Sequence, residues 1–111
     1  NIMTTPLPNT RVRGSNSGIA IMALFDLLGR KWNMRILWEL RPKPLSFRAV
    51  QEKCGGMSPS VLNGRVKQLT EAGLIVSSAS GYQLTELGVS LMDKMDPLRA
   101  WAEEWEGLLD A

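Results

Sequence analysis

The spacing of apolar residues predicts a mainly helical chain. In several segments these residues recur every three or four positions, which is the spacing of one face of a helix. Proline, glycine or small polar residues separate the segments, and such residues commonly end helices. Pro97 is expected to divide the last two helices, because proline lacks the amide hydrogen that a helix interior uses. The predicted helices span residues 19–28, 31–40, 48–54, 59–72, 86–95 and 98–109.

The helix predicted over residues 59–72 has the clearest start and the most polar outer face. Ser58 can cap its first amides, and Pro59 suits the first helical position. Its apolar stripe is narrow, which leaves a wide face for another partner. The stripe consists of Leu62, Val66 and Leu69, and the opposite face carries Ser60, Asn63, Gly64, Lys67 and Gln68.

A small β-hairpin is expected directly after this helix. Gly73 ends the helix, residues 74–76 and 82–84 form short strands, and residues 77–81 form the turn. Residues 45–47 are expected to be extended and to pair with this hairpin. The fold class is therefore mainly α with a small hairpin (α+β). A helix with a polar, basic face followed by a hairpin is the core of a winged helix-turn-helix, which usually reads duplex DNA.

A length of 111 residues indicates one domain. Residues 1–17 contain prolines and small polar residues and are expected to form a flexible arm, with a minor-groove or dimer-clasping arm as the alternative. Residues 18–111 are expected to form the winged domain, in which the C-terminal helices, at about residues 86–109, support dimerisation. No apolar run is long enough to span a membrane.

Charge is distributed unevenly along the chain. Residues 30–72 hold nine basic and three acidic side chains, whereas residues 85–111 hold two basic and seven acidic ones. The basic half can face phosphates, and the acidic end is expected to face elsewhere. Solvated helix faces would explain either charge run alone, but the basic run coincides with the helix-turn-helix pattern.

The predicted DNA contacts follow from that pattern. Ser60, Asn63 and Lys67 are the leading candidates for base edges and nearby phosphates, since asparagine suits adenine and serine suits either kind of contact. Gly64 would allow the backbone to approach a partner closely. The hairpin tip holds no basic residue, so we expect a weak positioning role from it or a purely structural one. The predicted DNA-binding set is Arg48, Ser58, Ser60, Asn63, Gly64, Arg65, Lys67, Gln68, Ser78 and Ser80.

A homodimer is predicted from the aromatic residues near the C-terminus. Trp101 and Trp105 are four residues apart and share a helix face with leucines. Core packing is the alternative, but aromatic residues are enriched at interfaces, and the winged core closes without this helix. A two-fold dimer would place two recognition helices about 34 Å apart, one turn of DNA. The predicted interface residues are Leu24, Leu98, Trp101, Trp105 and Leu108.

The residue inventory argues against an enzyme. Histidine is absent, so no Ser-His or Cys-His pair exists, and no cluster has the spacing of zinc ligands. Neither a cofactor nor a metal is expected. The single cysteine, Cys54, cannot form an internal disulfide, and a cytoplasmic setting is therefore expected. A buried structural role is the more common one for such a cysteine. The alternative is a redox role, in which the basic neighbours Arg48 and Lys53 lower its pKa and Gly55 and Gly56 expose it.

A series of short motifs lies in order along roughly residues 20–108. These motifs are Leu28-Gly29-Arg30-Lys31-Trp32, Ile36-Leu37-Trp38-Glu39-Leu40, Pro44-Leu45 with Phe47, Ser58-Pro59 with Leu62 and Arg65, Leu69, Gly73-Leu74, Tyr82 with Leu84-Thr85-Glu86-Leu87-Gly88, and Trp101. In these motifs the chain resembles the HxlR-type winged helix regulators of bacteria and archaea, relatives of the MarR type.

The resemblance implies a homodimeric transcriptional regulator with one winged domain per subunit. It implies that the 59–72 helix reads the operator, and that the first and last helices build the dimer. Some members of the family sense electrophiles or oxidants through a cysteine near the N-terminus, a region where this chain has none.

The sequence therefore predicts a dimeric repressor that binds a pseudo-palindromic operator. Two alternatives stay open at this stage. One is a winged module that contacts another protein through its tryptophan-rich last helix. The other is a sensor whose DNA binding responds to a thiol reaction at Cys54 or to an unknown small-molecule effector in an interface pocket.

Overall fold

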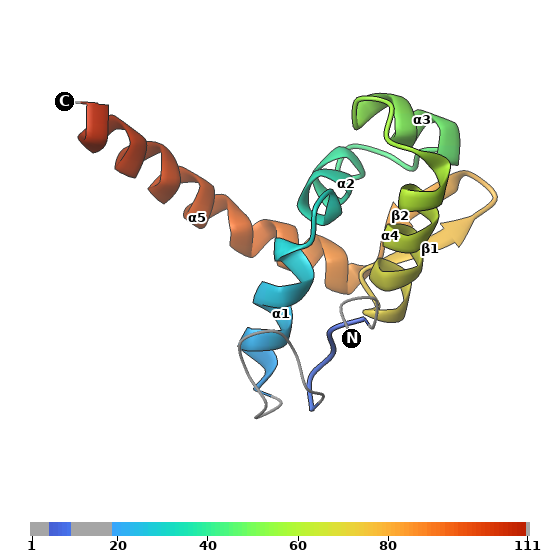
Figure 1. The fold of residues 1–111 in the computed structure, drawn as a ribbon, viewed down its shortest axis with the longest axis horizontal. Coiled ribbons are helices and arrows are strands. Elements are labelled where there is room, and N and C mark those ends of the chain that lie inside the picture. Colours follow the sequence, from blue (N-terminus) through green and yellow to red (C-terminus); the bar gives the residue numbers. More distant parts are fainter. Residues whose placement is uncertain (1–4, 10–18, 111) are drawn as a thin grey trace.

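The chain folds into a group of short helices with a hairpin, from which one long helix extends. The computed structural model describes residues 5–9 and 19–110, and predictions for the rest of the 1–17 segment lie outside that range. Helices with a two-stranded antiparallel sheet confirm the predicted fold class. In chain order the elements are α1 (Ala20–Gly29), α2 (Asn33–Glu39), α3 (Phe47–Lys53), α4 (Pro59–Glu71), β1 (Ile75–Ser78), β2 (Gly81–Leu84) and α5 (Glu86–Asp110) (Figure 1).

Serine side chains start both helices of the helix-turn-helix. The hydroxyl of Ser46 accepts a hydrogen bond from the Ala49 amide at 3.1 Å, at the start of α3. The hydroxyl of Ser58 accepts one from the Val61 amide at 3.2 Å, and Pro59 occupies the first turn of α4. Each cap satisfies an amide that the helix itself cannot pair and contributes about 1 kcal/mol. The predicted start of α4 is confirmed.

The hairpin is held against the chain segment that precedes α3. The Leu45 amide donates to the Tyr82 carbonyl at 2.9 Å, and the Tyr82 amide donates to the Leu45 carbonyl at 2.8 Å. The predicted pairing of residues 45–47 with the hairpin is thus confirmed at Leu45. Gly81 permits this close approach: its φ is +112°, and a Cβ there would lie 2.5 Å from the Leu45 carbonyl oxygen.

The core lies where α2, α3, α4 and the hairpin meet. Leu62 and Leu69 of the predicted α4 stripe are fully buried, and Val66 packs partly buried against the core. Complete burial of one such side chain contributes about 1.5–3 kcal/mol, so the stripe anchors α4 firmly. The buried core consists of Leu27, Ile36, Leu37, Leu40, Leu45, Val50, Cys54, Met57, Leu62, Leu69, Leu74, Ile75 and Met92.

The prediction of two C-terminal helices is wrong, because α5 runs unbroken through Pro97. A proline there removes one helical hydrogen bond to the carbonyl of Asp93. Asp93 and Pro97 are both exposed, so water can bind that carbonyl. Beyond the proline, the Arg99 guanidinium lies 5.6 Å from the Trp38 ring centre of α2, which ties the continuing helix to the body.

From Leu98 onward every described residue of α5 is exposed, and this half of the helix extends away from the other elements (Figure 1). Among the helices within residues 19–110, none combines the length and apolar character needed to cross a membrane.

The second helix begins later than predicted. Trp32, expected within it, has a φ of +82° and precedes the first helical residue, Asn33. Hydrogen bonds compensate for this turn: the Asn33 side-chain amide donates to the Leu27 carbonyl at 2.8 Å, and its backbone amide donates to the Arg30 carbonyl at 3.1 Å. A buried asparagine therefore holds the angle between α1 and α2.

Candidate nucleic-acid interface

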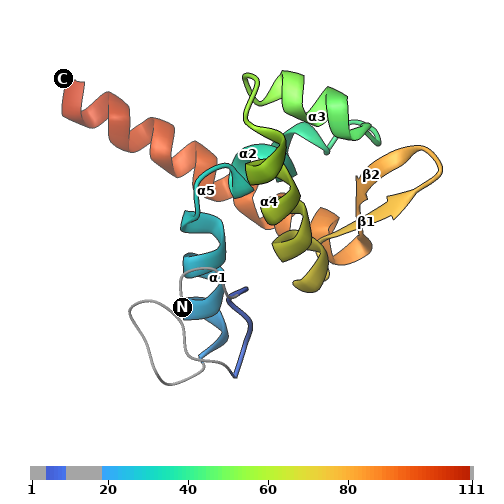
Figure 2. The ribbon, with the colours of Figure 1, turned by 45° about the vertical axis from the view of Figure 1, so that its right-hand side comes forward.

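The outer face of α4 is exposed, and it lies close to α3 and the hairpin at one end of the molecule (Figures 1 and 2). Ser60, Asn63 and Lys67 are all exposed on this face, as predicted. Gly64, between them, is half-buried, and a Cβ built there would meet no atom within 4 Å. Because Gly64 has no side chain and the space in front of it is open, a partner can approach the α4 backbone closely at this position.

Gln68 does not belong to this exposed face, so its predicted placement among the outward residues of α4 is wrong, and it is poorly placed for the predicted contact with DNA. Its exposed fraction is 4 %. It precedes Leu69 directly and so flanks the apolar stripe, where the rest of the protein covers it. The Arg65 guanidinium, itself half-buried, donates to the Gln68 side-chain oxygen at 3.3 Å. The buried side of α4 is therefore wider than its apolar residues alone indicate.

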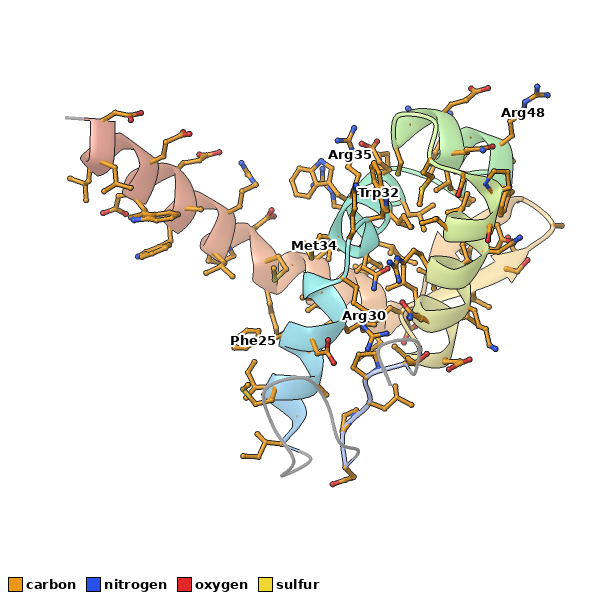
Figure 3. All side chains as sticks on the ribbon, in the orientation of Figure 1. Phe25, Arg30, Trp32, Met34, Arg35 and Arg48 are labelled. Atoms are coloured by element: carbon orange, nitrogen blue, oxygen red, sulfur yellow. The ribbon has the colours of Figure 1, made fainter. Side chains whose placement is uncertain are left out.

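Arg48 provides a cation on α3, close to the α4 face. Its side chain is 87 % exposed, and its Nε lies 3.8 Å from the Glu52 carboxylate. Figure 3 shows the side chain pointing outward from α3. An exposed ion pair of this kind is weak, and the guanidinium can leave it for a phosphate at little cost. Arg35, in contrast, bonds Glu39 at 2.7 Å and the Lys53 carbonyl at 3.0 Å, so it links α2 to α3.

The two predicted serines of the hairpin tip differ in their surroundings. The Ser78 hydroxyl donates to the Gly81 carbonyl at 3.0 Å and accepts from the Ser80 amide at 3.2 Å. These bonds tie Ser78 into the turn. Ser80 is exposed at the tip itself. The hairpin therefore presents Ser80 and backbone groups to a partner, without any cationic side chain.

Cys54 is a core residue, which confirms the expected buried structural role, and the alternative in which the following glycines expose it is wrong. Its exposed fraction is 3 %. Gly55 and Gly56 have φ of +83° and +77°, and they turn the chain while the cysteine stays against the core. Burial raises the pKa of the thiol, an effect that Arg35 opposes and Glu39 reinforces. The predicted basic neighbours, Arg48 and Lys53, are not the charges that act on it.

The predicted interface residues of α5 form an exposed apolar strip. Trp101 and Trp105 are 57 % and 53 % exposed, and their rings stack with centres 5.9 Å apart and planes 17° apart. Leu98 and Leu108 are also exposed. Leu24 is instead half-buried and faces a cavity between α1 and α5.

The first helix was expected to take part in the dimer, but two of its exposed apolar residues, Ile21 and Phe25, are absent from the predicted interface set. Ile21 and Phe25 are both exposed, and their spacing of four residues, which places them on one helix face, was the available signal. Figure 3 shows Phe25 pointing outward from α1, on the side toward which α5 extends. Among the described residues, no three potential metal ligands gather in one place.

Known proteins that resemble this chain include transcriptional regulators of bacteria and archaea. A regulator of Methanocaldococcus jannaschii, the HTH-type transcriptional regulator MJ0925, is 28 % identical over 90 residues, which cover 77 % of this chain and 84 % of the relative. The crystal structure of quinone-bound YodB from Bacillus subtilis matches with a TM-score of 0.70 and 29 % identity, covering 76 % of this chain and 94 % of YodB. A possible HxlR family transcriptional factor from Thermoplasma volcanium matches with a TM-score of 0.65 and 26 % identity, over 75 % of this chain and 81 % of that one.

These relatives are transcriptional regulators rather than enzymes, and their structures share the winged-helix arrangement described above. Residues 27–109 match the model of the HxlR-like helix-turn-helix family, which includes α2 to β2 and nearly all of α5. The chain therefore belongs to the HxlR-like helix-turn-helix family of transcriptional regulators, whose function implies DNA binding.

Proposed function

We propose that this regulator is a homodimer that represses transcription by inserting α4 of each subunit into successive major grooves of a pseudo-palindromic operator. The observation that carries the proposal is the exposed polar face of α4. Firmly anchored by Leu62 and Leu69, this helix keeps its opposite side free of contacts within the protein. A helix of this size fits the major groove, where base edges can be distinguished.

The exposed residues of α4 divide into base-reading and phosphate-binding groups. Asn63 can pair its side-chain amide with adenine, and Ser60 can bond to either a base or the backbone. Lys67 of α4 and Arg48 of α3 supply exposed cations for the phosphates. Contacts to phosphate provide most of the affinity and release counterions, so binding weakens steeply with salt.

A second copy of the chain covers the exposed apolar strip of α5 and α1. A helix that extends into water with two stacked tryptophans exposes more apolar surface than a monomer usually does. The acidic residues of this helix half, Glu103, Glu104 and Glu106, lie away from α4, so dimerisation here keeps them clear of phosphates (Figure 1). Two subunits joined in this way present two copies of α4.

The direct test is a pull-down of genome fragments with the purified protein at physiological salt, followed by sequencing of what is retained. The proposal expects a pseudo-palindrome whose half-sites lie about 10 base pairs apart. The variant N63A serves as the matched control, because it keeps the fold and loses the base-reading amide. Folded protein that retains nothing above background would exclude the proposal and favour a protein-interaction module.

One observation on a relative favours regulation by a small molecule: YodB, which matches most of this chain, is known in a quinone-bound form. In this chain the response cannot rest on an exposed thiol among the described residues, because Cys54 is buried and its pKa is raised. A ligand-responsive version of the proposed repressor therefore needs another site.

A further inference from the structure

A cavity of about 380 Å³ lies between the N-terminal segment, α1, the end of α4 and the start of α5. Its size is within the range of small-molecule sites, which runs from about 300 to 1,000 Å³. The walls are almost entirely apolar. Pro6 and Pro8 line it from the N-terminal segment, Ala23 and Leu27 from α1, and Leu87 and Leu91 from α5.

The polar side chains of this cavity sit together on α5. The Lys94 ammonium donates to the Ser90 hydroxyl at 3.1 Å, and both residues line the cavity. Within residues 5–9 and 19–110, Lys94 takes part in no ion pair. An ammonium group has three donors. The Ser90 hydroxyl accepts a hydrogen bond from one of these donors. A neutral hydroxyl does not balance the positive charge of the Lys94 ammonium, which lies beside a wall of leucines and prolines.

The cavity lies mostly on a different face of α1 from the exposed Ile21 and Phe25, and Leu24 lies at the border between the two faces. Ala23 and Leu27 face the cavity, whereas Ile21 and Phe25 are exposed. The two pairs are offset by two residues, which is a rotation of roughly 200° about the helix axis. A dimer that covers Phe25 can therefore leave the cavity open to a ligand.

We propose that this cavity binds a small organic monocarboxylate with an apolar body. The apolar body would fill the space between α1 and α5, and the carboxylate would accept a charge-assisted hydrogen bond from Lys94. A neutral molecule of the same shape gains the apolar contacts and lacks this bond. A cation of the same shape meets a like charge at the rim.

Binding there would act on the reading helix, and this step rests on the proposed function. Ala72, which caps the end of α4, and Leu74, which follows it, line the same cavity. The remaining walls belong to the N-terminal segment and to α1 and α5, the helices of the proposed dimer. A ligand wedged among them changes the angle between α4 and the dimer axis, and with it the separation of the two reading helices.

The test uses the full chain with 2-naphthoate as the probe and naphthylmethanol as its neutral counterpart. Calorimetry without DNA measures both affinities for the unmodified protein and for K94M, which keeps the length of the side chain and removes its charge. K53M, an exposed lysine of α3 remote from the cavity, is the matched control. A20F adds bulk at the exposed edge of the cavity, at the start of α1.

We expect saturable naphthoate binding that K94M weakens about five- to tenfold, the loss typical of one charge-assisted bond at an accessible rim. K94M should not change the affinity for naphthylmethanol. K53M should change the affinity for neither ligand, and A20F should lower the affinity for both. Absence of saturable naphthoate binding, or an equal effect of K94M on acid and alcohol, would overturn the assignment. If the unmodified protein binds no naphthoate and A20F is monomeric, the cavity is filled by a second copy of the chain. That result would also overturn the assignment.

Naphthoate should also change the affinity for a retained DNA fragment by about fivefold or more. Because ligand binding is measured without DNA, a protein that binds naphthoate but no DNA would refute the proposed function and leave the cavity assignment standing. Ligand binding with unchanged DNA affinity would refute the coupling between the cavity and α4.

Discussion

The indole rings of Trp101 and Trp105 stack on each other with centres 5.9 Å apart, on a helix surface that is more than half exposed. Because the two tryptophans are about one helical turn apart on α5, their stacked rings form one continuous apolar surface. Such aromatic pairs commonly anchor protein interfaces, where their burial excludes water from a large area.

The double variant W101A/W105A is therefore expected to be monomeric at protein concentrations where the unmodified chain is dimeric. Sedimentation velocity measures the change, and circular dichroism checks that the helices remain. E106A, an exposed change on another face of the same stretch of α5, is the control and should keep the dimer. A double variant that sediments like the unmodified protein would place the interface elsewhere.

Asn63 is expected to discriminate between DNA sequences. N63A should lose about 1–3 kcal/mol of binding free energy on the specific site and little on random duplex, because only base pairs of the right sequence bond its amide. Fluorescence anisotropy on the two duplexes measures the difference. T70A, an exposed change near the end of the same helix, should alter neither affinity. Equal losses on both duplexes would remove Asn63 from base reading.

Much of this architecture follows from local signals in the chain. Ser58, Pro59 and the three-residue apolar stripe place α4 correctly, because helix caps and periodicity act within a few residues. The expected pairing of residues 45–47 with the hairpin likewise came from the pattern of short extended segments, and it occurs between Leu45 and Tyr82.

The departures come from interactions that a local pattern does not contain. Gln68 looks like an outward polar residue, and only its tertiary neighbours bury it and supply Arg65 as a partner. Pro97 looks like a helix break, and only its exposed surroundings let water replace the lost bond. Trp32 adopts a positive φ because the buried Asn33 side chain secures that turn. The start and the apolar stripe of α4 were thus predictable, and the exact extent of its exposed surface was not.

Lys67 is expected to act on the DNA backbone without sequence preference. K67M should weaken binding to specific and random duplexes alike, and it should flatten the slope of log affinity against log salt by about one. Titrations at four or more salt concentrations measure that slope. K31M, a lysine of the turn between α1 and α2, serves as a charge-matched control. An unchanged slope for K67M would mean that this ammonium group touches no phosphate.

Two glycines should respond to alanine in opposite directions. G81A should lower the free energy of unfolding by about 2 kcal/mol or more, because Gly81 has a φ of +112° and a Cβ there would meet the Leu45 carbonyl. G64A should raise it by up to about 1 kcal/mol, since Gly64 is helical with open space in front of it. Urea unfolding measures both values.

The same G64A variant should bind operator more weakly despite its greater stability. An added methyl group at the centre of the α4 face would hold the backbone away from the groove. Stability and affinity that rise together would show that no partner approaches Gly64 closely.

Cys54 is expected to react slowly in the native protein. Because burial raises its pKa above the ordinary thiol value, the thiolate is scarce at neutral pH, and reaction with iodoacetamide requires opening of the core. Burial stabilises the protonated thiol, so the native thiol should ionise at a higher pH than the unfolded one. Its contribution to stability should be complete below the pKa of the unfolded thiol and should be lost as pH rises from there through the higher pKa of the native thiol. Mass spectrometry of alkylation with and without urea should show a rate that rises steeply on unfolding.

C54A, which keeps the site small and apolar, should bind DNA as the unmodified chain does. Rapid native alkylation accompanied by release of DNA would instead make Cys54 a sensor, and the loss of that response in C54A would prove it.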